Sequence, residues 1–139
     1  MRTLLLLLIL LCGAPVLGEE GFRNLPKGSI VLNFHLRLEI GGRIVEMKPT
    51  IAVNDGQSAE LEIFSDKGEE EYVRLSAKPR LGVNNKVDLE LHISSGLAGC
   101  AIQRKLRLTA LLDSESLYQV TDAKNREKIS LTVKPHLVD

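Results

Sequence analysis

Alternation of apolar and polar residues is the feature that most restricts the fold of this chain. Between residues 29 and 40 every second side chain is apolar, so one face of an extended strand would carry Ile30, Leu32, Phe34, Leu36, Leu38 and Ile40. The same period recurs in nearly every later segment, and no window of a dozen residues keeps apolar positions three and four apart, as a helix requires. The sequence therefore predicts an all-β protein.

Turn residues divide the first half of the chain into strands. Gly41-Gly42 suits a two-residue hairpin, because glycine tolerates the positive φ of the tight turns that match strand twist. The segments 54–56, 66–68 and 83–85 end in Gly or Asn and suit three-residue loops with a left-handed last residue. We therefore expect a meander of five antiparallel strands near residues 29–40, 43–53, 57–65, 69–81 and 86–94.

Each turn also predicts a register, which the charges on the polar face support. In chain order, the expected pairs are Arg37 with Glu46, Ile51 with Ala59, Met47 with Ile63, Glu60 with Arg74, Arg80 with Asp88, and Lys78 with Glu90. A slip of one residue would exchange the core and solvent faces and separate the opposite charges.

The second half of the chain continues the β pattern. Residues 94–101 (SSGLAGCA) are small and predict a crossing to another sheet or around a corner, and Arg104 is expected to mark the exposed beginning of the next strand. A hairpin near 114–116 and a loop near 123–126 follow, and Pro135 is expected to end the ladder. Strands with one apolar face must stack or close on themselves. The predicted fold is an antiparallel meander of about eight strands closing as a β-sandwich or small barrel.

The N-terminal segment has the features of a secretory signal. Arg2 precedes an apolar run, and Val16 and Gly18 occupy the two positions that a signal peptidase reads. We expect a signal peptide at 1–18, a polar tether at 19–28, a single β domain at 29–139, and a periplasmic or secreted protein. The alternative is a lipoprotein anchored at Cys12, although Leu11 stands where such signals carry a small residue.

Composition restricts the partners and the redox chemistry. The 18 basic and 18 acidic residues balance, so no net field would attract nucleic acid. Removal of the signal peptide would leave Cys100 as the sole cysteine, which excludes an intrachain disulfide. We expect Cys100 to be a buried apolar residue, with an intermolecular disulfide as the alternative.

No motif in the sequence predicts catalysis or a cofactor. His35 and His92 lie on polar strand faces without the local spacing of metal ligands, so surface histidines are favoured over a shared His35/His92 metal site. The run Glu69–Glu71 lacks the pattern of a calcium loop and is expected to protect a sheet edge. Neither a Gly-x-Ser-x-Gly elbow nor a glycine-rich phosphate loop is present. We therefore expect no catalytic, cofactor-binding or metal-binding residues.

One short stretch resembles a known family. Residues 49–63, PTIAVNDGQSAELEI, are similar to the Pro-led strand, Asn/Asp-Gly turn and Ala-containing strand of the β domain of outer-membrane secretins. The resemblance covers 15 of 139 residues, and the chain has no room for the longer secretin domain, so pore formation is not implied. It implies a small envelope protein with similar β structure.

These observations lead to a functional expectation. The favoured class is an exported, noncatalytic envelope protein, a protein-binding or assembly β module that contacts another envelope protein through a strand face, a loop or an exposed edge. The candidate interaction face consists of His35, Arg37, Glu39 and Glu46, which the alternative interpretation treats as residues that keep the sheet soluble. The alternative function is a small hydrolase or metal-binding protein whose site is built from distant loops.

Overall fold

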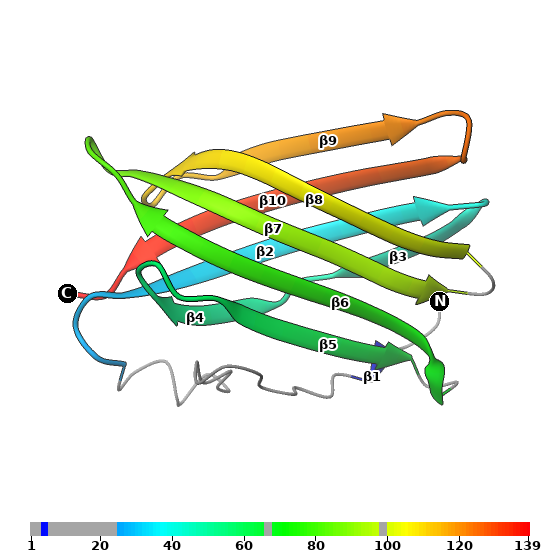
Figure 1. The fold of residues 1–139 in the computed structure, drawn as a ribbon, viewed down its shortest axis with the longest axis horizontal. Coiled ribbons are helices and arrows are strands. Elements are labelled where there is room, and N and C mark those ends of the chain that lie inside the picture. The colour runs from blue at the N-terminus through cyan, green and yellow to red at the C-terminus, as the bar shows by residue number, and fades with distance from the viewer. Residues whose placement is uncertain (1–3, 6–24, 66–67, 98–99) are drawn as a thin grey trace.

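Two antiparallel sheets pack face to face in the computed structural model, which describes residues 4–5, 25–65, 68–97 and 100–139 (Figure 1). Sheet I has the strand order β1 (Leu4–Leu5), β5 (Ala59–Ser65), β6 (Gly68–Leu81), β7 (Lys86–Leu97) and β8 (Cys100–Leu111). Sheet II has the order β3 (Arg43–Met47), β2 (Ser29–Ile40), β10 (Glu127–Leu137) and β9 (Ser116–Asp122), and β4 (Thr50–Asn54) also pairs with β2. The prediction of an all-β, sandwich-like fold is confirmed.

The apolar faces of the two sheets form one core. Leu32, Leu36 and Leu131 of sheet II and Leu61 and Leu75 of sheet I are almost completely buried within it. This is the physical reason for the strict alternation of the sequence, because each strand covers the core with one face and meets water with the other. In the described part of the chain, no helix reaches the length and apolar character of a membrane span.

The first hairpin forms as its turn residues predict. Gly41 and Gly42 both have positive φ, and Arg37 lies opposite Glu46. The expected strand 43–53 is interrupted at residues 48 and 49, but β3 and β4 keep a single register on β2. The Phe34 N–H donates to the Pro49 carbonyl at 2.9 Å within the interruption, so β2 is bordered along its whole length.

The next turn separates two sheets, and the predicted pairing of Ile51 with Ala59 and of Met47 with Ile63 is wrong. Gly56 has the expected left-handed conformation, with φ of 76°. However, β4 pairs with β2 in sheet II, whereas β5 pairs with β6 in sheet I. The crossing follows from the one-sided apolar pattern, since the apolar face of β2 and β4 needs a second layer to cover it.

The β5–β6 register differs from the prediction by two residues. Arg74 lies opposite Glu62 instead of Glu60, because the register shifts between Phe64 and Ser65. The predicted charge contact still forms, since the Arg74 Nε lies 2.8 Å from a Glu60 carboxylate oxygen and the guanidinium also pairs with Glu62. A shift of two residues preserves both faces, so the alternation alone could not detect it. The β6–β7 register is confirmed, with Arg80 opposite Asp88 and Lys78 opposite Glu90.

The chain returns to sheet II later than predicted. β7 and β8 are paired up to Leu97 and Cys100 within sheet I, so the small-residue segment 94–101 does not cross between sheets. The crossing occurs between β8 and β9, where a hairpin near 114–116 was expected, and β10 then pairs with β2 over its full length. The predicted loop at 123–126 is confirmed, since β9 and β10 pair on either side of it.

Arg104 joins the two sheets and does not mark an exposed strand beginning. Its guanidinium lies 3.0 Å from carboxylate oxygens of both Asp122 in β9 and Glu127 in β10. Both carboxylates raise the pKa of Arg104, first through their hydrogen bonds and then through their charge. An arginine on the core side of β8 is therefore accommodated because it reaches across the margin of the sandwich.

Two prolines lie inside strands without disturbing the ladders. Pro135 pairs with Leu32 and β10 continues to Leu137, so the prediction that Pro135 ends the ladder is wrong. Its carbonyl accepts the Asp113 N–H at 2.7 Å, and the carbonyl of Pro79 in β6 accepts the Gly56 N–H at 2.8 Å. Each proline thus lies just beyond the end of the neighbouring strand, opposite a segment where the chain crosses between sheets. No ladder hydrogen bond is required at that position, so a residue without an N–H is tolerated there.

The first crossing is also held by a side chain, which gives a testable expectation. Asp55 Oδ1 accepts the backbone N–H of Leu81 at 2.8 Å. Replacing Asp55 with Ala is expected to lower the free energy of unfolding by about 0.5 to 1.5 kcal/mol, because the Leu81 N–H loses its partner. Urea denaturation would measure the loss. Asp55→Asn retains an acceptor at the same place, so an equal loss in both variants would contradict this role.

Candidate functional site

The four residues of the predicted interaction face gather on the outer surface of sheet II. Alternation along β2 directs His35, Arg37 and Glu39 away from the core, and the Gly-Gly hairpin brings Glu46 of β3 beside them. Together they line part of a shallow hollow of about 260 Å³. The remaining lining residues are Gln119, Lys128, Ser130 and Thr132, which come from β9 and β10.

Charges within this hollow pair differently from the strand register. Glu46 is opposite Arg37, but its carboxylate is hydrogen-bonded to His35, whereas Arg37 contacts Glu39 at 3.2 Å. His35 and Glu46 are diagonal neighbours on adjacent strands, within reach of long side chains, and Arg37 and Glu39 are two residues apart on the same face of β2. The hollow therefore combines paired charges with the hydroxyl and amide groups of β9 and β10.

The hydrogen bond from His35 lowers the pKa of Glu46 below its ordinary value, and the charges of His35, Arg37 and Lys48 act in the same direction. A carboxyl with a lowered pKa stabilises the fold above its ordinary pKa of about 4.3, and this contribution disappears as the pH falls through the folded-state value. NMR titration of the Glu46 carboxyl should therefore give a midpoint below that of an isolated glutamate. His35→Ala should raise it, and an unchanged midpoint would contradict the contact.

Sequence reasoning missed the residues from β9 and β10. Lys128, Ser130 and Thr132 follow the same alternation as β2, so their polar face was readable from the chain. Their position beside His35 and Arg37 depends on the pairing of β10 with β2, in which Thr132 lies opposite His35 and Ser130 opposite Arg37. These partners are more than 90 residues apart in the chain, and no local turn predicts such a pairing.

The histidines are distributed over the molecule in a way that excludes the shared metal site. His35 lies on the outer face of sheet II, whereas His92 lies on the outer face of sheet I, so the core separates them. His136 in β10 hydrogen-bonds to Asp113 through Nδ1 at 2.7 Å. Among the described residues, no three His, Cys, Asp or Glu side chains are grouped as metal ligands would be. The side chains of Glu69–Glu71 and Cys100 lie outside the described part of the structure.

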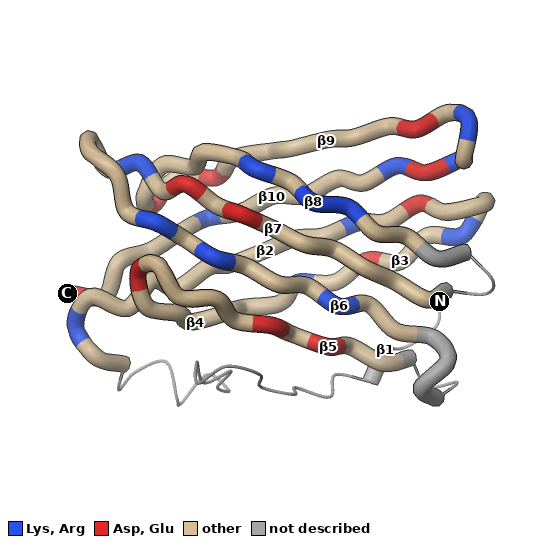
Figure 2. The backbone as a smooth tube through the Cα atoms, viewed as in Figure 1, with Lys and Arg blue, Asp and Glu red and all other residues tan. Residues whose placement is uncertain are grey.

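The outer face of sheet I carries a regular pattern of charge. The charged side chains described on this face are acidic on β5, basic on β6, acidic on β7 after Lys86, and basic on β8. Figure 2 shows red segments on β5 and β7 and blue segments on β6 and β8. The charged residues that form the pattern are Glu60, Glu62, Arg74, Lys78, Arg80, Asp88, Glu90, Lys105 and Arg107. Each strand thus faces neighbours of opposite sign, which favours this strand order and register.

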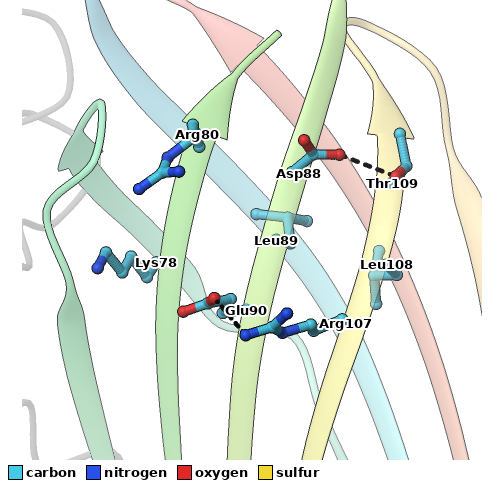
Figure 3. Close-up of a pocket in the computed structure, with 8 residues that line it drawn as sticks. All are labelled: Lys78, Arg80, Asp88, Leu89, Glu90, Arg107, Leu108 and Thr109. Carbon is cyan, nitrogen blue, oxygen red and sulfur yellow. Dashed lines mark hydrogen bonds and ion pairs between the residues drawn. The ribbon is translucent and has the colours of Figure 1, made fainter.

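A second shallow hollow of about 370 Å³ crosses β6, β7 and β8 on this face (Figure 3). Asp88 accepts a hydrogen bond from Thr109 at 2.9 Å, and Arg107 contacts Glu90 at 3.1 Å. In Figure 3, Lys78 and Arg80 extend away from these pairs, and no described residue forms an ion pair with either cation. The hollow therefore combines ionic contacts with a hydrogen bond between a hydroxyl and a carboxylate.

Comparison with protein families, with curated proteins and with solved structures finds no match for this chain.

Proposed function

We propose that this protein is an exported, noncatalytic module of the bacterial envelope that binds or assembles proteins. The observation that carries the proposal is the outer face of sheet II, where β2, β3, β9 and β10 contribute charged, hydroxyl and amide groups around one shallow hollow. A wide, polar and open surface suits contact with another protein, because binding sites for small molecules enclose most of their ligand in a largely apolar pocket.

Export supports the same proposal. The predicted signal peptide at 1–18 would direct the chain to the periplasm or to the outside, where an envelope protein is the expected partner. Leu4 and Leu5 are the described residues of that segment, and they pair antiparallel with Phe64 and Ser65 at the edge of sheet I. Cleavage after Gly18 would therefore release this part of the edge of β5 from its partner.

Capture from a native envelope extract tests the proposal when face variants are compared quantitatively. The bait is the wild-type chain, the face variant is Arg37→Ala with Lys128→Ala, and the matched control is Lys78→Ala with Arg80→Ala, which removes two cations from the other sheet. We expect the wild type and the control to retain the same partner, and the face variant to retain at least about tenfold less. Equal recovery by all three proteins would contradict binding through sheet II.

A further inference from the structure

The described strands leave much of the two outer edges of sheet I unpaired. No described strand pairs with the outer edge of β8, and on the outer edge of β5 Leu4 and Leu5 pair only with Ser65 and Phe64. Residues 59–63 of β5 therefore have no described strand beside them on that side. An unpaired edge is a template for another strand.

Hydrogen bonds at the ends of the strands show which backbone groups face these edges. The Leu112 N–H donates to the Asn85 carbonyl in continuation of the β7–β8 register. The backbone N–H and C=O groups of even-numbered residues of β8 therefore point to β7. Because backbone groups alternate in direction along a strand, Lys105 and Arg107 direct their N–H and C=O groups to the free edge.

The same reasoning applies to β5. The Gly82 N–H donates to the Lys86 carbonyl. The backbone N–H and C=O groups of even-numbered residues of β6 therefore point to β7, and those of odd-numbered residues point to β5. Ala77 is opposite Ala59, and consequently Glu60 and Glu62 direct their backbone groups to the free edge of β5. At both edges, the unpaired backbone groups belong to residues whose charged side chains lie on the outer face.

The charge pattern of sheet I identifies a matching strand. Signs alternate from β5 to β8, and a strand added beside basic β8 would continue the alternation only if its outer face were acidic. β5 satisfies this condition, because its sequence AELEI alternates apolar residues with Glu60 and Glu62. Its direction also fits, since β5 runs opposite to β8, and β5 of a second copy in the same orientation would meet β8 antiparallel.

The core is less completely covered at the β8 margin than at the β5 margin. Leu61 and Ile63 of β5 are buried, whereas Leu108 of β8 and Tyr118 and Val120 of β9 are only partly buried. A neighbouring molecule at β8 would remove this apolar surface from water, in addition to forming the backbone ladder and the ion pairs.

We propose that copies of this protein assemble edge to edge through sheet I, with β8 of one copy pairing antiparallel with β5 of the next. This inference rests on the proposed assembly function and names a second copy of the chain as a partner. The contact joins two different surfaces, so it is head-to-tail and leaves a free β5 edge and a free β8 edge at the ends of a dimer. Copies that keep the same orientation therefore extend into a linear chain of molecules. Higher salt weakens it, because opposite charges on exposed strands form part of the contact.

Sedimentation velocity of the purified full chain over a wide concentration range tests this assembly. We expect the mean mass of the wild type to rise with concentration beyond that of a dimer. Arg107→Pro and Glu60→Pro each remove one edge-facing N–H and one charge while leaving the internal ladder intact. Each variant alone should associate at least about tenfold more weakly. An equimolar mixture should form a discrete one-to-one dimer, because one variant retains the β5 edge and the other the β8 edge.

Leu117→Pro on β9, at a residue that is 66% exposed and outside the sheet II hollow, is the matched control. It also introduces proline at the outer edge of a strand, but in sheet II, and it should associate like the wild type; circular dichroism and cooperative thermal unfolding confirm that each variant folds. A monomeric wild type at every concentration, or unchanged association of Arg107→Pro, would overturn the assembly. If the wild type is monomeric and still captures an envelope partner through Arg37 and Lys128, only the edge pairing fails. If Arg107→Pro then loses that capture, β8 accepts a strand of another protein, which also overturns self-pairing.

Discussion

Replacing Leu36 with alanine is expected to lower the free energy of unfolding by about 2 to 5 kcal/mol. Leu36 is fully buried at the centre of β2, where it lies opposite Met47 on one side and Leu131 on the other. The loss combines the removal of apolar atoms from the core with the cavity that the rigid neighbouring strands leave behind. Chemical denaturation of the two proteins measures the difference.

Two further variants separate this effect from a general loss of strand propensity. Ile44→Ala truncates a side chain that is 55% exposed on β3, and its effect should stay within about 0.5 kcal/mol. Leu36→Met conserves most of the volume and should lose less than about 1.5 kcal/mol. Similar losses for Leu36→Ala and Ile44→Ala would contradict the placement of Leu36 in the core between the sheets.

The second large effect is expected at Gly96. This glycine lies opposite Tyr72 in the β6–β7 pair, and a Cβ atom at this position would lie 2.6 Å from Tyr72 Cε1. The Tyr72 ring is also in contact with Arg74, whose guanidinium carbon is 5.5 Å from the ring centroid. Gly96→Ala should therefore displace the ring and lower the free energy of unfolding by about 1 to 3 kcal/mol, measured by denaturation.

Gly82 provides the control for this substitution. A Cβ atom at Gly82 would make only ordinary contacts with Lys86, at 3.5 and 3.9 Å, so Gly82→Ala should change the free energy of unfolding by less than about 0.5 kcal/mol. In a Tyr72→Ser background, Gly96→Ala should lose much of its effect, because the clash partner is gone. Equal destabilisation by Gly96→Ala with and without the Tyr72 ring would refute the contact.

Local turn chemistry explains which parts of the fold could be predicted from the sequence. Gly41-Gly42 and Asn84-Asn85 produce hairpins between strands that pair directly, so their positive φ angles predict both the turn and the register. The turn at Asn54 to Gly56 has the same sequence features but separates two sheets. A turn determines the local path of the backbone and does not determine whether the next strand pairs with the previous one or covers it.

The candidate site was likewise predictable from the sequence only in part. Alternation along a single strand placed His35, Arg37 and Glu39 on one face, and a hairpin added Glu46. The other half of the hollow required the pairing of β10 with β2, which is specified by the packing of the whole core. Arg104 illustrates the same limit, because its interruption of the apolar pattern has its explanation in Asp122 and Glu127 of the opposite sheet.

Both outer faces and both free edges depend on the division of the strands into two sheets, and one NMR measurement tests it directly. Gly41 donates to the carbonyl of Arg126, so Leu36 and Leu131 form a non-hydrogen-bonded pair whose Cα atoms are about 4.5 Å apart. A strong nuclear Overhauser effect between the α-protons of Leu36 and Leu131 is predicted. Its absence, together with a corresponding signal between Ile51 and Ala59, would show a single continuous meander and contradict the two-sheet structure.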